Sequence, residues 1–164
     1  GAGFDIYGAR VNSLGNNLDA AGVQIHHLLS QQKHPAVACR PVSPNNCLVV
    51  WDDDRSGPQD IIGTRLTVSV GSLSVLDPSG IVISSAPQAQ TAPAVASDGA
   101  NFFVVWADFR TLIDSDVYGA NFDPLSGTVL GPDFPVALRP QDQFEPSVVF
   151  GLGLYLMSDT EEAP

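Results

Sequence analysis

The apolar residues of this chain come in short runs, such as Leu48 to Trp51 and Phe102 to Trp106, which Gly, Pro, Asn and Asp residues separate. Short apolar runs bounded by such turn formers are typical of β-strands. The 15 glycines and 13 prolines are spread along all 164 residues, and long helices do not tolerate that spacing. The pattern therefore predicts an all-β protein and excludes an all-α one.

The pattern also repeats with a period of about 55 residues, and a fixed period of this kind indicates a repeat architecture. The run that starts Asp-Ile-Tyr-Gly-Ala at Asp5 returns at Asp60 and Asp116, and the Val-Val-Trp run that ends at Trp51 returns at Trp106. Two further markers recur in the same register. The first has copies at Gln32 to Val37, Gln90 to Val95 and Gln143 to Val148, and the second has copies at Leu18 to Gly22, Leu76 to Gly80 and Leu130 to Phe134.

Each repeat predicts four short strands, but the chain begins at the third strand of a repeat and ends after a second one, near Met157. We therefore expect one repeat domain over residues 1–164. Repeat 1 would be divided between 1–30 and 141–164, repeat 2 would cover 31–88, and repeat 3 would cover 89–140. Four-stranded repeats whose ends are offset in this way are typical of β-propeller blades, in which strands from the two chain ends pair.

The run from Phe103 to Arg110, followed by Asp116 to Ala120, resembles the tandem repeats of secreted bacterial propeller-type proteins of largely unassigned function. The resemblance covers nearly the whole chain and implies an architecture rather than an activity. The last copy departs from it, because Met157 stands at the tryptophan position and Glu161 at the arginine position.

Three repeats are fewer than the four to eight blades of ordinary propellers. One alternative is a dimer in which two chains build one ring, and another is a contact that does not close and so produces a filament. The chain could also be a fragment of a longer propeller. A β-trefoil or a β-prism is the alternative fold that fits three four-stranded repeats.

Cys39 and Cys47 flank a turn rich in Pro and Asn between two apolar runs, at the positions that Ser97 and Phe102 occupy in the next repeat. This placement predicts a disulfide across a hairpin, with two free buried thiols as the alternative. A disulfide favours an oxidising setting, and we expect an extracellular or cell-surface protein. The chain begins at Gly1 rather than at Met, so we expect a mature, trimmed or excised product.

The formal net charge is −11, and no Lys or Arg cluster is present. Such a chain would be repelled by nucleic acid and by anionic membranes, so neither is an expected partner. The longest apolar runs are far shorter than the roughly 20 residues that a membrane span needs, which argues against membrane insertion.

Trp51 and Trp106 are candidate stacking platforms for sugar rings, although packing in the repeat core is the interpretation that we prefer. The loops that follow both tryptophans contain further candidate ligand contacts. These are Asp53 and Arg55 in one repeat, and Asp108, Arg110 and the aromatic Phe109 in the next. The competing interpretation is that the Asp and Arg residues form ion pairs or caps in loops.

Two acidic runs, Asp52 to Asp54 and Asp114 to Asp116, are candidate Ca²⁺ ligands, but neither has the spacing of a known calcium loop and solvated acidic loops are the default. His26, His27 and His34 lack the spacing of a zinc site. We therefore expect no cofactor and no metal. No nucleophile or phosphate-loop motif is present, and a glycoside hydrolase with paired carboxylates is a minor alternative.

These observations favour a non-enzymatic, extracellular structural or adhesive protein that associates with itself through its unpaired terminal strands. Its partner would be a second copy of the chain, in a multimer or a filament. The alternative function is a lectin-like module that binds surface glycans through loops repeated around a ring.

Overall fold

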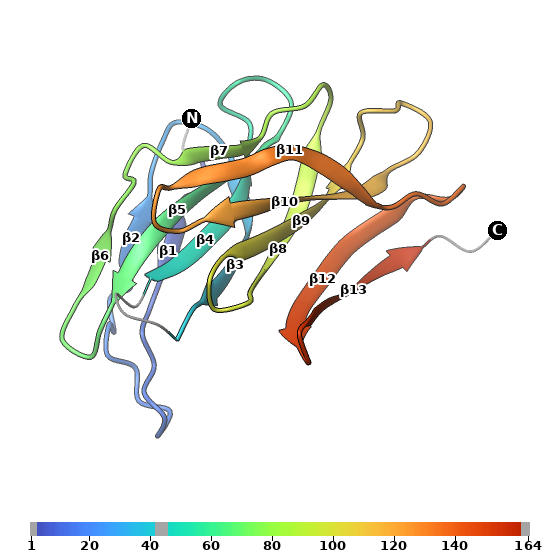
Figure 1. Ribbon diagram of the computed structural model, residues 1–164. Helices are drawn as coiled ribbons and strands as arrows, with labels where there is room; N and C mark the ends of the chain where they lie inside the picture. The colour runs from blue at the N-terminus through green and yellow to red at the C-terminus, as the bar shows by residue number, and fades with distance from the viewer. Residues whose placement is uncertain (1–2, 42–45, 162–164) are drawn as a thin grey trace.

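The computed structural model describes residues 3–41 and 46–161, and all of its regular elements are β-strands (Figure 1). The predicted all-β class is therefore confirmed. The strands are β1 (Ile6–Gly8), β2 (Val23–His26), β3 (Gln32–Cys39), β4 (Asn46–Asp53), β5 (Asp60–Val68), β6 (Leu73–Val75), β7 (Ile81–Ser84), β8 (Gln90–Ser97), β9 (Phe102–Asp108), β10 (Asp116–Asp123), β11 (Thr128–Ala137), β12 (Gln143–Gly151) and β13 (Leu154–Glu161).

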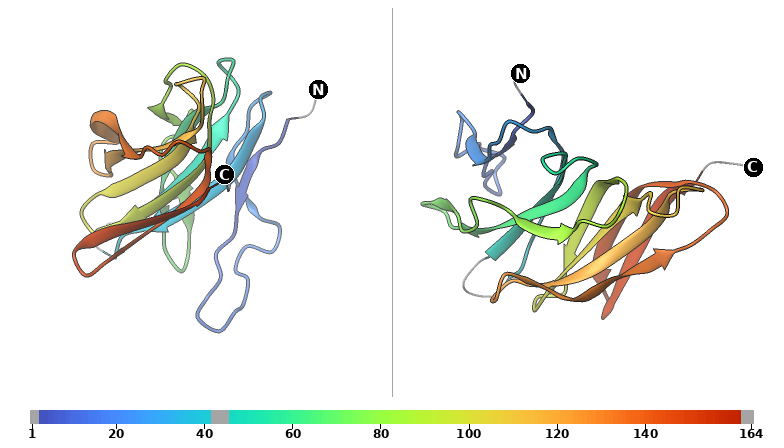
Figure 2. Two further views of the ribbon diagram at one scale, coloured as in Figure 1. Left: turned by 90° about the vertical axis from the view of Figure 1, so that its right-hand side faces the viewer. Right: turned by 90° about the horizontal axis from the view of Figure 1, so that it is seen from above.

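The strands form four antiparallel sheets that follow one another along the chain. Sheet 1 is β1 and β2, sheet 2 is β3 to β6 in order with β7 also paired to β5, sheet 3 is β8 to β11, and sheet 4 is β12 and β13. The sheets stand in a row, with sheet 1 at one end and sheet 4 at the other (Figures 1 and 2). None of them closes on itself within the described residues, and sheets 1 and 4 are not paired with each other.

The two segments that the sequence assigns to repeat 1 thus lie at opposite ends of the row. Residues 1–30 supply the two strands of sheet 1, and residues 141–164 supply the two strands of sheet 4. A tight hairpin turn at Asp98 and Gly99 joins β8 to β9. The predicted disulfide is also confirmed, since Cys39 and Cys47 are bonded and lie opposite each other on β3 and β4.

Neighbouring sheets pack face to face, because alternate residues of each central strand point to opposite sides. On β4, Leu48 and Val50 pack against sheet 3, whereas Val49 and Trp51 pack against sheet 1. On β9 the same alternation directs Val104 and Trp106 towards sheet 2 and directs Phe103 and Val105 towards sheet 4. The central strands β4 and β9 are therefore buried on both faces.

The first strands of sheets 2, 3 and 4 lie side by side and share one irregularity. Each has a register shift where a residue with positive φ precedes a proline, at His34 (φ 51), Ala92 (φ 50) and Glu145 (φ 49). Positive φ is uncommon for residues other than glycine. The same local strain at three corresponding positions gives β3, β8 and β12 one common shape along the inner edge of the row.

An arginine on the outer part of sheets 1 and 2 connects each of them to the next sheet. Arg10 pairs with Asp19 at 2.6 Å and donates to the carbonyls of Ser69 and Val70 in sheet 2. In sheet 2, Arg65 pairs with Asp77 at 2.7 Å and donates in the same way to the carbonyls of Pro124 and Leu125 in sheet 3. We call each of these groups an arginine clamp. Sheet 3 has Asn121 at the corresponding position.

Candidate functional site

The predicted ligand residues of sheet 2 form one buried polar group at the end of β4. The indole N–H of Trp51 donates to Asp53, and Asp53 accepts two hydrogen bonds from Arg55, one from its backbone N–H and one from its guanidinium at 2.5 Å. Burial raises the pKa of Asp53, but the hydrogen bonds from Arg55 and Trp51 outweigh burial and hold that pKa below its usual value. His26 of sheet 1 packs on the Trp51 ring, with 4.8 Å between the ring centroids.

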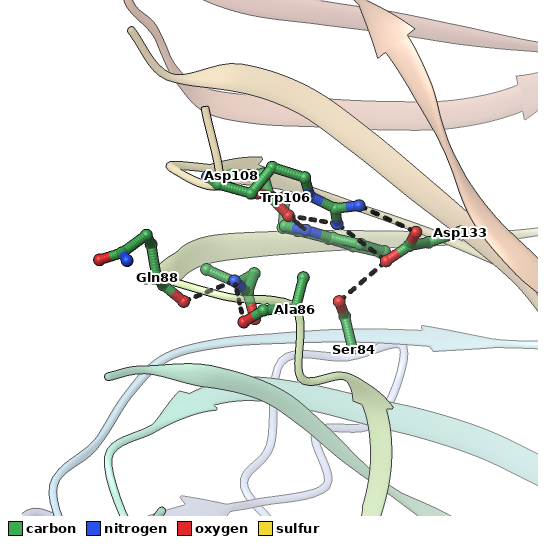
Figure 3. A network of polar contacts seen from close by, with 8 residues as sticks. Ser84, Ala86, Gln88, Trp106, Asp108 and Asp133 are labelled. Atoms are coloured by element: carbon green, nitrogen blue, oxygen red, sulfur yellow. Dashed lines mark hydrogen bonds and ion pairs between the residues drawn. The ribbon is translucent and has the colours of Figure 1, made fainter. Parts of the chain in front are cut away.

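The corresponding group of sheet 3 has the same arrangement (Figure 3). Trp106 donates to Asp108 at 2.9 Å, and Arg110 donates to Asp108 through its backbone N–H, its Nε and one terminal nitrogen. Arg110 also pairs with Asp133 of β11 at 2.9 Å, and Asp133 in turn accepts a hydrogen bond from Ser84 of sheet 2. The hydrogen bond to Asp108 is the main reason why the pKa of Arg110 is raised.

Sheet 4 has a reduced version of this group. Asp159 occupies the position of Asp53 and Asp108, and its partner Arg139 comes from the segment that precedes β12. Arg139 also pairs with Glu161, at 2.6 Å. The side chains of Arg139 and Glu161 are both about two-fifths exposed, so this group lies much closer to solvent than its counterparts.

Trp51 and Trp106 are both 0 % exposed, and Asp53 and Asp108 are also 0 % exposed. The two indole rings therefore present no face on which a sugar could stack, and the observed packing agrees with the structural interpretation of these residues. Phe109 is half-buried on the β9–β10 loop, where its ring lies 6.3 Å from that of Phe144 on β12. The structure thus divides the seven candidates between two separate groups, one in each complete sheet.

The three consecutive carboxylates of residues 52–54 point to different partners. Asp52 accepts hydrogen bonds from the backbone N–H of Ala92 and contacts His34 at 2.6 Å, while Asp54 accepts from the backbone N–H of Gln31. Asp53 belongs to the buried group already described. Within residues 3–41 and 46–161, no group of three or more His, Cys, Asp or Glu side chains is arranged to hold a metal ion.

Two further carboxylates open the third strands of the complete sheets, opposite the buried ones. Asp60 lies opposite Asp53, and Asp116 lies opposite Asp108. Burial raises the pKa of both Asp60 and Asp116.

Within residues 3–41 and 46–161, sheets 1 and 4 have two strands each, whereas sheet 3 has four. In sheets 2 and 3 the second strand pairs with the third, as β4 does with β5 and β9 with β10. Sheet 4 supplies a first and a second strand, so one edge of β13 has no paired strand among the described residues. Sheet 1 supplies strands that correspond to a third and a fourth strand, and in the part of the chain that the structure describes the complementary edge of β1 is unpaired.

The free end of sheet 4 also exposes an apolar face. Tyr155 and Met157 pack against sheet 3, whereas Leu154 is 70 % exposed and Leu156 is 71 % exposed. Val149 of β12 is exposed on the same side. Leu154 and Leu156 correspond to Leu48 and Val50 of β4, which are 0 % exposed because sheet 3 covers them.

The free end of sheet 1 has an apolar groove between β1 and sheet 2. The groove has a volume of about 410 Å³ and is lined mainly by apolar side chains, among them Ile6, Tyr7, Ile25, Val37, Val49 and Leu66. Val37 is 62 % exposed there, because β3 has no first strand packed on that side among the described residues.

The arginine clamps were not identified from the sequence. The sequence does contain a signal for them. An Arg follows the Asp-Ile-Tyr-Gly-Ala run at residues 10 and 65, and in the same two copies an Asp occupies the second position of the Leu-Asp-x-x-Gly run, at residues 19 and 77. In sheet 3, Asn121 and Gly131 replace the Arg and the Asp.

Residues 3–41 and 46–161 contain no helix that is long and apolar enough to cross a membrane. No known protein family and no curated protein sequence matches this chain.

Proposed function

We propose that this protein is a non-enzymatic, extracellular structural or adhesive module that associates with further copies of itself through sheets 1 and 4. In this proposal the four sheets are part of a β-propeller, and the two terminal half-sheets of different copies combine into one complete four-stranded blade. The disulfide of Cys39 and Cys47 supports an extracellular location, because such bonds persist in oxidising compartments.

The observation that carries the proposal is the complementarity of the two free edges. The edge of β13 is the kind of edge that pairs with a third strand in sheets 2 and 3, and the edge of β1 is the kind that pairs with a second strand. Unpaired strand edges expose a row of backbone donors and acceptors and recruit other strands. Sheets 1 and 4 lie at opposite ends of the row and do not pair with each other, so in this proposal a second copy supplies the strand that pairs with each free edge (Figures 1 and 2).

The exposed apolar face of sheet 4 supports the same proposal. Burying a leucine side chain contributes about 1.5–3 kcal/mol, so covering Leu154 and Leu156, which are still largely exposed, would contribute a few kcal/mol to association. The carbohydrate-binding alternative places its sites in the loops that follow Trp51 and Trp106, with the two indole rings as the candidate stacking platforms. Because Trp51 and Trp106 are buried, we do not propose it.

The test is the mass distribution of the intact chain over a range of concentrations, measured by mass photometry and by light scattering after size exclusion. We expect dimers or longer assemblies for the native chain and a large shift towards monomer for Leu156→Lys. The matched control is Ile113→Lys, which replaces a side chain that is 88 % exposed on the β9–β10 loop and should leave assembly intact. A native chain that stays monomeric at all concentrations would refute the proposal.

A further inference from the structure

We propose that the groove between β1 and β3 is the binding site for the β12–β13 hairpin of a second copy, and that the hairpin binds in the strand register of the complete sheets. This inference rests on the proposed self-association and specifies the surface, the occupant and the alignment.

The register follows from the two complete sheets. Asp53 lies opposite Asp60 and Asp108 lies opposite Asp116, where second and third strands meet. Asp159 corresponds to the first member of each pair, and Asp5 corresponds to the second. A β13 strand that pairs with β1 of another copy in this register therefore has Asp159 opposite the partner copy's Asp5.

The tryptophan positions define the same alignment. Trp51 lies opposite Ile62 and Trp106 lies opposite Tyr118, and their counterparts at the chain ends are Met157 and Tyr7. Met157 faces sheet 3 of its own copy. Tyr7 is 55 % exposed, whereas its neighbour Ile6 is buried against sheet 2. Residues opposite each other in antiparallel strands point to the same side, so Tyr7 and Met157 would both face sheet 3 of the copy that provides β13.

The same register directs the exposed apolar face of the hairpin into the groove. Leu156 alternates with Met157 and so points away from sheet 3, towards the sheet that follows the completed blade. That sheet is sheet 2 of the other copy, where Val37 is 62 % exposed in the groove lining and the buried Val49 lies beneath it. Leu154 and Leu156 would thus be buried as Leu48 and Val50 are buried within one copy.

The charges at the two ends are complementary, which favours pairing between unlike ends. Residues 139–161 contain four carboxylates and one arginine. Residues 3–41 contain three Lys and Arg residues, all three histidines and two carboxylates, in a chain whose formal net charge is −11. Opposite potentials at an interface steer the partners together and suppress pairing of like ends.

The inner strands provide a specific instance of this complementarity. A pocket is lined by His34, Ala92 and Glu145, which are the three bulge residues of β3, β8 and β12. A β12 strand packed beside β3 of another copy, in the way that β8 packs beside β3, would bring Glu145 next to the partner copy's His34. The His34 side chain contacts Asp52 of its own copy at 2.6 Å and is still 59 % exposed, so Glu145 would approach its solvent-facing side.

The experiment is disulfide trapping between two variants of the full chain that each carry one added cysteine. Tyr7→Cys and Met157→Cys are prepared separately, mixed and oxidised, and the native cysteines do not interfere because they are bonded to each other. We expect covalent dimer in the mixture at about ten-fold or more the yield of either variant alone, since docking raises the effective thiol concentration. Gly8→Cys mixed with Leu156→Cys tests the same register with a position that is exposed in β13.

The off-register control combines Val11→Cys with Met157→Cys. Assemblies that persist by mass photometry but yield no more in-register than off-register dimer would overturn the proposed register while leaving self-association intact. A chain that forms neither assemblies nor trapped dimer would overturn both proposals. Selective trapping of the two in-register pairs supports the groove as the binding site.

Discussion

Asp108→Asn tests whether the buried polar groups stabilise the complete sheets. The Asp108 carboxylate is 0 % exposed and accepts hydrogen bonds from Trp106 at 2.9 Å and from the Arg110 guanidinium at 2.8 and 2.6 Å. Asparagine has nearly the same shape, but its amide replaces one acceptor oxygen by a donor that faces other donors. The substitution therefore removes the negative charge and leaves part of the Arg110 charge without its partner.

The size of the effect follows from the burial of both partners. Removing one member of a buried ion pair costs about 3–5 kcal/mol. Arg110 keeps its contact with Asp133 and is 22 % exposed, so we expect a smaller loss of about 2–3 kcal/mol for Asp108→Asn. Asp159→Asn is the matched comparison, because its partner Arg139 is 38 % exposed and also contacts Glu161. For that substitution we expect a loss of about 1 kcal/mol or less.

The measurement is urea unfolding followed by tryptophan fluorescence, with far-ultraviolet circular dichroism to verify that each variant is folded. All samples are compared at one chain concentration, because self-association would shift the apparent stability. Equal losses for Asp108→Asn and Asp159→Asn would refute the argument that burial of the pair determines its contribution.

Two further predictions concern the arginine clamps. Asn121→Arg introduces an arginine at the place where sheet 3 would contact the β1–β2 loop of another copy. We expect association to strengthen about five-fold, because a charged donor at an exposed site would gain hydrogen bonds to backbone carbonyls of that loop. Mass photometry against Asn121→Gln checks it, and an unchanged distribution would contradict it. The hydrogen bond from Arg10 lowers the pKa of Asp19 to about 2. Because the folded pKa lies below the unfolded one, this contribution to stability is present above about pH 4 and is lost as the pH falls towards 2. Chemical unfolding should thus show Asp19→Asn to be less stable than the native chain near neutral pH, with the difference vanishing near pH 2, and a difference that persists there would contradict the reasoning.

Much of the local structure could be predicted from the sequence, because strand and turn preferences depend on neighbouring residues. The apolar run from Leu48 to Trp51, the Asp98-Gly99 turn and the spacing of Cys39 and Cys47 all belong to hairpins whose strands are adjacent in the chain. The candidate site was harder to predict. The recurrence of Trp51 and Trp106 marks them as equivalent, yet their exposure depends on which sheet packs over them.

By itself, then, the sequence predicted the β-class, the short strands along the chain and the disulfide. The tertiary structure decided that both tryptophans are buried, that Arg10 contacts carbonyls far away in the chain, and that sheets 1 and 4 lie at opposite ends of the row. The physical reason is the range of the interactions. Hydrogen bonding within a hairpin is local, whereas burial and the position of a free edge depend on how whole sheets pack.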